Sequence, residues 1–370
     1  MQRLIGLTLI PLLAAGGLAA ASDGAVEHGV LQLFGDFRLR LEENAGDQDI
    51  STTQRMQLRT RAGVRYVYSP RLTLGTRVTF SETSSFQGFD RTATALISSH
   101  RTVLDHAYLR YQRENWSIGA GRFVNPFSKT DYQLVWDNDF NPQGLTAELD
   151  LGRKEAHRSV YHVIGIQALL EPEGVGAGSQ MTGVQLVVSR ATDHRRFRFA
   201  VGYFDYSLNG RPHAHSGRVR GNRLDPDGGY TSDYDLLNVI GSIHTQPFGP
   251  SWPIEIVGDY VKNLGADAGT DTGYAIDVFA GNADHAGDVR VNYTLSRAQV
   301  DSVLTAVSHD NTRLGSNYFQ HSFGVEFIPR AGISLSATWY HYRPDNPLFA
   351  RANDSDDWLE RVRLNFNISL

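Results

Sequence analysis

The chain contains no cysteine in its 370 residues. This absence excludes a disulfide framework and a metal site built from thiolates. After residue 21 the chain also lacks an apolar run near the roughly 18 residues that a membrane-spanning helix requires. A membrane protein built from helices is therefore not expected.

An excess of charge of one sign is missing as well, because 35 Lys and Arg stand against 40 Asp and Glu. The net charge of −5 says little about partners, so the positions of the charges matter more than their sum. Aromatic side chains, in contrast, are abundant, with 16 Tyr, 18 Phe and 5 Trp. They favour β-strands and predict an all-β protein.

The first residues have the pattern of a secretory signal. Arg3 supplies a positive charge, residues 4–13 are apolar, and small residues at 19–21 form a cleavage site. The sequence therefore predicts a signal peptide at residues 1–21, which is removed, and a mature chain of residues 22–370. An exported all-β chain is either a soluble protein or a barrel in an outer membrane.

The end of the chain, residues 358–370, alternates between polar and apolar side chains from position 361 to the last residue. A period of two over this length indicates a β-strand with two unlike faces, because a helix would mix both sets on every side. The apolar positions are Val362, Leu364, Phe366, Ile368 and Leu370, and the polar ones include Arg361 and Arg363. We expect this strand to pair with the first one, near residues 31–41.

The same alternation recurs along the chain and predicts about sixteen antiparallel strands, an even number that places both termini on the periplasmic side. Long and short connections follow each other in turn, so long loops should lie on the extracellular side and short turns on the periplasmic side. The expected strands are 31–42, 54–68, 72–80, 102–112, 116–123, 145–151, 160–169, 182–190, 196–206, 235–245, 254–262, 273–280, 289–295, 319–328, 333–342 and 358–370.

A soluble β-sandwich would also show alternating strands. Three features favour a transmembrane β-barrel instead: the number of strands, the asymmetric loop lengths, and aromatic residues near strand ends that resemble the girdles at a membrane interface. The girdle candidates are Tyr66, Tyr68, Phe80, Tyr111, Trp116, Phe123, Trp339 and Trp358.

If the apolar faces contact lipid, the arginines between them must face the lumen. An Arg on the lipid side costs about 2–4 kcal/mol at the bilayer midplane. The candidates for the pore lining are Arg38, Arg40, Arg59, Arg61, Arg65, Arg77, Arg110, Arg196, Arg198, Arg290, Arg361 and Arg363. They are densest on the first two strands and the last, which become neighbours when the barrel closes, so we expect one basic wall.

Two interpretations of these arginines stay open. They can pair with lumen carboxylates, as buried charges do, or they can form an electrostatic filter that concentrates anions. A planar guanidinium group suits carboxylates and phosphates in particular. The candidate partners are Asp36, Glu42, Glu148, Glu255, Asp259 and Glu326.

The segment 121–144 mixes aromatic and acidic residues and contains two prolines that stop strand pairing. We expect it to fold into the lumen opposite the basic wall and set the narrowest point of the pore. The alternative is an external loop packed on its neighbours. The candidate constriction residues are Asn125, Pro126, Phe127, Trp136, Asp137 and Asp139.

Several stretches together resemble the putative porin family of Gram-negative outer membranes. They are Gly121-Arg122 with Asn125-Pro126-Phe127, the run Val135-Trp136-Asp137-Asn138-Asp139 with Pro142-Gln143-Gly144, the stretch 34–42, and the arginine-rich strand 55–65. A more distant similarity is to alginate-export channels. The resemblance implies passive passage of solutes, anionic ones among them, and a place in the outer membrane. One departure is the final Leu370, where such barrels often end in Phe.

Other functions have little support. The chain contains neither GxSxG nor HExxH, and His213-Ala214-His215 lacks a carboxylate at metal-ligand spacing, so we expect no enzyme, no cofactor and no metal. Inward arginines also argue against nucleic-acid binding. The alternatives are a specific channel or exporter for an acidic polysaccharide or carboxylate, a barrel enzyme, and a structural anchor or adhesin. The expected partners are outer-membrane lipid and lipopolysaccharide, the barrel-assembly machinery, small polar or anionic solutes, and further copies of the chain.

Overall fold

The structure, a computed structural model, describes nine stretches of the chain. The predicted signal peptide at 1–21 and the His213-Ala214-His215 stretch lie outside them. In the nine described stretches, no helix is long and apolar enough to cross a membrane. The described stretches are 29–45, 53–81, 91–92, 101–152, 159–170, 177–192, 195–209, 220–350 and 358–370.

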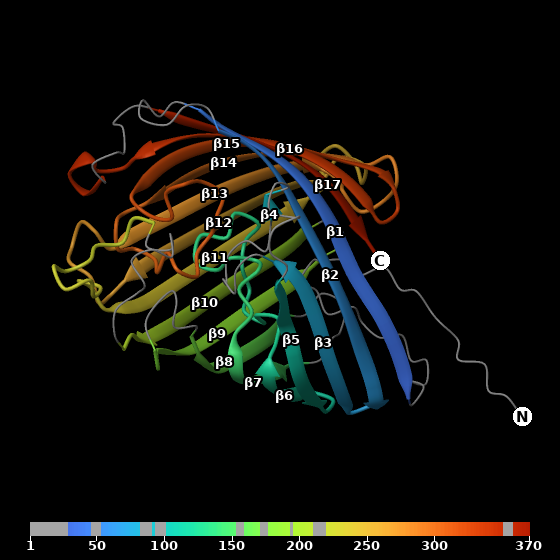
Figure 1. Cartoon of the computed structure of the whole chain (residues 1–370). Coiled ribbons are helices and arrows are strands. Elements are labelled where there is room, and N and C mark those ends of the chain that lie inside the picture. Colours follow the sequence, from blue (N-terminus) through green and yellow to red (C-terminus); the bar gives the residue numbers. More distant parts are fainter. Residues whose placement is uncertain are drawn as a thin grey trace, which may run out of the picture.

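The described residues form one antiparallel sheet that closes into a barrel (Figure 1). Consecutive strands of the wall pair with each other, with β3 pairing directly to β5, and β1 pairs with both β2 and β17, so sixteen of the strands form the wall. The two-residue β4 is an additional piece beside β2. The strands are β1 Val30–Ala45, β2 Thr53–Ser69, β3 Leu72–Ser81, β4 Arg91–Thr92, β5 Arg101–Gln112, β6 Trp116–Arg122, β7 Gln143–Leu151, β8 Val160–Leu169, β9 Gln180–Ala191, β10 Arg195–Ser207, β11 Tyr234–Thr245, β12 Ile254–Asn263, β13 Thr272–Gly281, β14 Val289–Ala298, β15 Tyr318–Arg330, β16 Ile333–Pro344 and β17 Leu359–Ser369.

The seam between β1 and β17 confirms the expected role of the chain's end. Leu41 lies opposite Leu364 and Arg40 opposite Asn365 in an antiparallel register that extends over ten residue pairs. The amide of Leu370 also donates to the carbonyl of Gly35 at 3.0 Å. Strand β17, which contains neither Gly nor Pro, is thus hydrogen-bonded on both sides, to β1 and to β16.

The two faces of the wall differ as the alternation predicts. On the outer face, Leu41 and Leu364 keep 47% and 46% of their surface exposed, as expected for side chains that lipid would cover. Arg361 and Arg363 on the inner face keep only 6% and 5%. At this seam the apolar residues therefore turn outward, and the inner face of the wall is polar.

The connections differ in length between the two ends of the barrel. The periplasmic turns are short, as at 70–71 and 331–332, where Gly332 adopts a φ of 78° that favours glycine. The extracellular connections are long, and one of them contains the 3₁₀ turn Pro347–Phe349. The fully buried aromatic residues in these loops and the adjoining strands form a core inside the barrel.

The prediction that Phe123 belongs to the aromatic girdle is wrong. Phe123 is only 6% exposed and belongs to the internal core rather than to the outer rim. The reason is that β6 ends at Arg122, and the chain then turns into the barrel interior.

Candidate functional site: the lumen and its inward segments

The segment 123–142 between β6 and β7, which we call the first inward segment, spans the interior of the barrel (Figure 1). It is bonded to three separate strands. The Ser128 amide donates to Gln185 on β9 at 2.6 Å, and the Thr130 hydroxyl donates to Asp259 on β12 at 3.1 Å. The Tyr132 hydroxyl contacts Gln320 on β15 at 3.3 Å. A segment with these contacts lies within the lumen rather than outside the barrel.

An aromatic stack holds the first inward segment in place. The Trp136 ring stacks on Phe140 at 5.3 Å and on Phe127 at 5.8 Å between centroids, and its edge meets Phe204 of β10 at 4.9 Å. Nearby, the Asn125 side chain accepts a hydrogen bond from the Phe127 amide at 3.1 Å. Pro126 lies between these two residues and breaks strand pairing where the chain turns inward.

The other end of the first inward segment meets the basic wall. Arg59 and Arg61 bind the Asp139 carboxylate with Nη1 to Oδ1 distances of 3.2 and 3.0 Å. Both arginines also bind Asp36, the Arg61 Nε at 2.6 Å. Burial alone would raise the pKa of Asp139, but the two guanidinium groups hold that pKa well below its usual range.

A second segment, 299–317 between β14 and β15, also folds into the lumen and was not predicted; we call it the second inward segment. Leu304 and His309 have no exposed surface. Its Asp310 carboxylate lies 3.4 Å from Arg363, whose Nε binds Glu42 at 2.7 Å on the opposite side. Burial would raise the pKa of Asp310, but Arg363 and its arginine neighbours keep the pKa far below the ordinary value.

The two inward segments bind each other across the lumen. The Asp137 amide donates to the Val307 carbonyl at 2.8 Å, and the His309 amide donates to the Gln133 carbonyl at 3.2 Å. Burial, together with the nearby Asp310 and Asp139 carboxylates, raises the pKa of Asp137 to about 8. Burial and the Arg220 charge lower the pKa of His309 to about 3, so this imidazole is neutral at physiological pH.

The twelve predicted arginines all lie on the lumen face, but they form two groups. The basic wall, on β17, β1, β2 and β3 at the level of the inward segments, contains Arg38, Arg40, Arg59, Arg61, Arg77, Arg361 and Arg363. The other five lie on strand halves near the periplasmic turns, in a region that we call the vestibule: Arg65, Arg110, Arg196, Arg198 and Arg290.

The vestibule is a balanced mixture of charges. Arg110 binds Glu148 and Arg290 binds Glu326, both at 3.0 Å, and Arg196 contacts His244 at 3.2 Å. These groups are more solvated than those of the basic wall, since the side chains of Arg110 and Arg290 are 37% and 35% exposed. The five vestibule arginines face five described carboxylates: Asp131, Glu148, Asp150, Glu255 and Glu326.

The basic wall is paired but not neutralised. Arg77 binds Asp105 at 2.5 Å, and Arg40 donates to Asn365 at 2.8 Å. Together with Arg220, which donates to the Thr312 carbonyl at 3.2 Å, the wall brings eight guanidinium groups to five described carboxylates. Those carboxylates are Asp36, Glu42, Asp105, Asp139 and Asp310. Lys129 and Asp137 at its edge add at most one charge of each sign. Without these two groups, the eight guanidinium groups outnumber the five described carboxylates by three.

The six carboxylate partners proposed from the sequence do not all form ion pairs, and Glu255 forms none with the described residues. Four of them, Asp36, Glu42, Glu148 and Glu326, form ion pairs with lumen arginines. Asp259 instead accepts hydrogen bonds from Thr130 and from Asn238, the latter at 2.6 Å. Within the described stretches, no three His, Asp or Glu side chains are arranged to hold a metal ion.

The second inward segment escaped the sequence analysis because it carries no distinctive motif. Residues 300–308 are small or aliphatic and resemble an ordinary linker. The signal that could have found it is length, since the connection extends over 299–317 between two clear strands. Loops of that length are uncommon unless they have a role of their own.

The comparisons with known proteins agree with this geometry. The model of a family described as "Putative porin" matches residues 44–227. Among solved structures, OprB of Pseudomonas putida at high pH is 12% identical, with a TM-score of 0.61 over 92% of this chain and 94% of that one. OmpT of Vibrio cholerae expressed in the outer membrane is 11% identical, with a TM-score of 0.54 over 94% and 99% of the two chains.

The outer membrane channel DcaP of Acinetobacter baumannii is 12% identical, with a TM-score of 0.53 over 94% and 99% of the two chains. At these identities the likeness to solved structures shows the fold alone. No curated protein matches the chain. The family match covers the first inward segment and the arginine-rich β2, which carry the motifs found in the sequence. The chain therefore belongs to the putative porin family of Gram-negative outer membranes.

Proposed function

We propose that this porin is a passive diffusion channel that favours small anionic or polar solutes, and that the basic wall is its selectivity element. The observation that carries the proposal is the excess of guanidinium groups over carboxylates at the level where both inward segments narrow the lumen. The vestibule, by contrast, is balanced. Selection by charge therefore belongs to the basic wall rather than to the whole length of the pore.

The pairing of the arginines supports this role instead of opposing it. Asp36 and Glu42 fix the guanidinium groups of Arg61 and Arg363 through contacts of 2.6 and 2.7 Å. A cation held in this way does not need to be reorganised when an anion passes. Two unit charges 4 Å apart attract by about 4 kcal/mol at an effective dielectric constant of 20. The neighbouring carboxylates reduce this attraction, which lets the anion enter and also leave.

The test is a measurement of reversal potential in planar bilayers under a KCl gradient. The wild-type protein is expected to conduct and to prefer chloride. The variant R38S/R40S, which removes two charges from the centre of the basic wall, should lose most of that preference. The matched control R71S/R330S removes two arginines from the periplasmic turns, outside the lumen, and should keep it. A preference for potassium in the wild type would contradict the selectivity, and the absence of conductance would contradict the channel.

A second candidate is a specific channel or exporter for an acidic polysaccharide or carboxylate. The observation that favours it is the depth to which the two inward segments fill the extracellular half of the lumen, with Leu134 and Leu304 fully buried. Such a channel would show low conductance that submillimolar amounts of one carboxylate or an oligouronate block. A general diffusion channel would show no block by either compound. Binding to lipopolysaccharide, to the assembly machinery and to further copies of the chain stays a prediction.

A further inference from the structure

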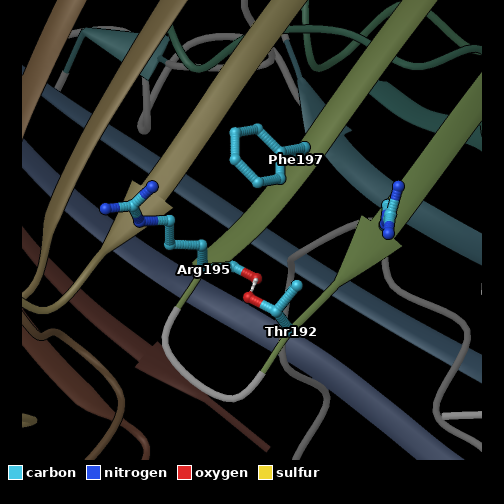
Figure 2. A pocket seen from close by; sticks show the side chains of 4 residues that line it. Thr192, Arg195 and Phe197 are labelled. Carbon is cyan, nitrogen blue, oxygen red and sulfur yellow. Dashed lines mark hydrogen bonds between the residues drawn. The ribbon is translucent and has the colours of Figure 1, made fainter. Parts of the chain in front are cut away.

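A hollow of about 690 Å³ lies on the outer face of the barrel at the periplasmic end of the β9–β10 hairpin. It is lined by Arg190, Thr192, Arg195 and Phe197. Figure 2 shows Phe197 and Arg195 on β10, with Thr192 at the turn below them. The Thr192 hydroxyl donates to the Arg195 carbonyl at 3.2 Å, which ties the end of β9 to the start of β10 beside the hollow.

The register shows that these side chains face away from the lumen. Phe197 lies directly opposite Arg190, and its neighbour two positions along, Phe199, lies opposite Val188. Phe197 and Phe199 are 42% and 50% exposed, as other outer-face residues are. Arg196, between Arg195 and Phe197, points into the vestibule and contacts His244. The two arginines of the hollow therefore take no part in the pore.

The position of Arg190 and Arg195 along the barrel axis corresponds to the periplasmic membrane interface. Phe199, Leu186 and Val184 continue the same face toward the bilayer centre with exposed apolar side chains. Below the arginines the strands end, at Ala191 and before Arg195. From the bilayer centre toward the periplasm, this face therefore presents apolar side chains, then an aromatic ring, and then guanidinium groups. A glycerophospholipid has the same order of acyl chains, glycerol and phosphate.

Arginines near a membrane edge commonly extend to water without binding anything. Two observations distinguish this pair. Arg190 and Arg195 flank one hollow from adjacent strands, and neither forms an ion pair with a carboxylate of the described residues. Elsewhere on the rim, Arg113 differs, because its guanidinium donates to the Tyr111 hydroxyl at 2.9 Å and lies over that ring.

We propose that this hollow binds the phosphate headgroup of an anionic glycerophospholipid in the periplasmic leaflet, with Arg190 and Arg195 on the phosphate and Phe197 against the glycerol and acyl chains. Guanidinium groups suit phosphate oxygens because their donors lie in one plane. Anionic headgroups are also attracted by basic residues at the membrane surface. The proposal concerns the outer face alone and does not depend on which solute passes through the lumen.

The test is native mass spectrometry of the purified full chain in detergent, titrated with phosphatidylglycerol or phosphatidylcholine of identical acyl chains. The wild type should retain phosphatidylglycerol preferentially. Each arginine is expected to account for about a fivefold change in affinity, so R190Q/R195Q should bind phosphatidylglycerol about 30-fold more weakly. The control R71Q/R330Q removes the same charge from two other periplasmic turns and should behave as the wild type.

Three results would overturn the proposal. The first is an unchanged lipid preference in R190Q/R195Q, and the second is an equal loss in R71Q/R330Q, which would indicate general charge rather than a site. The third is displacement of bound phosphatidylglycerol by inorganic phosphate alone, added at the concentration of the lipid. Phosphate lacks the chains that Phe197 would contact, so displacement of phosphatidylglycerol would identify a site for free phosphate. Heat-dependent mobility on gels and channel conductance, both expected to be unchanged, establish that R190Q/R195Q is folded.

Discussion

The first inward segment is attached to the barrel by different chemistry at its two sides. On the β2 side, Asp139 is bound by two guanidinium groups. On the β9 and β12 side, hydrogen bonds donated by Ser128 and Thr130 and the stack around Trp136 hold it, without an arginine. Ion pairs are screened by salt and respond to pH and to passing ions, whereas aromatic packing has no charge to screen or titrate. One side of the segment can thus serve selection while the other serves as its anchor.

The largest effect is expected from removing the carboxylates that the inward segments bring to the basic wall. D139N/D310N leaves the arginines without these partners, and breaking one buried ion pair costs about 3–5 kcal/mol. We expect lower stability in urea and, in the protein that still folds, a stronger chloride preference in bilayers. An unchanged reversal potential would show that the wall does not face the ion path.

Truncating the aromatic anchor should lower stability without changing ion selectivity. Trp136 is only 1% exposed, and replacing such a side chain by Ala costs about 3–5 kcal/mol. W136A is therefore expected to lower stability and to increase current noise, because the segment loses its packing against Phe204. Ion selectivity should stay near the wild-type value, since no charge changes. A shift in selectivity as large as that of D139N/D310N would erase the distinction between the two sides.

A smaller effect is expected from pH, through Asp137 at the contact between the inward segments. Its pKa of about 8 in the folded protein exceeds the ordinary value of 3.8, so the folded state binds more protons than the unfolded state between these values. Stability should therefore decrease as the pH rises from about 4 to 8 and level off above. Ionised Asp137 repels Asp310 and Asp139, so conductance should increase from pH 6 to 9. D137N should lack both trends.

The smallest effect is expected in the vestibule. The ion pair of Arg290 with Glu326 is partly solvated, with side chains 35% and 26% exposed, and such pairs contribute about 0–1 kcal/mol. R290Q should change stability by less than about 1 kcal/mol and leave the chloride preference nearly intact. A loss of preference comparable with that of R38S/R40S would move the selectivity element from the basic wall to the vestibule.

The barrel itself was predictable because membrane strands follow a local rule. Leu364 and Arg363 show why: adjacent side chains point to opposite faces, and lipid accepts only one of the two. The pairing of β1 with β17 followed from closure of the barrel, whereas the structure supplied its register. The expectation for Phe123 was wrong because it used only the residue's place at a strand end. Trp116 and Ile118 are exposed on the outer face, and a count in twos from them places residue 123 on the inner face.

The site was predictable in part, for a related reason. Acidic residues between two prolines indicated an inward segment opposite arginines, and Asp139 does meet Arg59 and Arg61. The second inward segment depends on contacts that no local pattern encodes. Asp310 binds Arg363, which lies 53 positions along the chain, and the backbone at Val307 accepts from Asp137.

By itself, the sequence determined the strands, their two faces and the enrichment of arginine on the inner face, because alternation with period two and the cost of charge in lipid act residue by residue. Only the tertiary structure decided how those charges are distributed. Closure of the barrel brings β17 beside β1, and the two inward segments then carry Asp139 and Asp310 to the arginines. Charge balance in a lumen is a sum over distant residues, and the fold determines which of them meet.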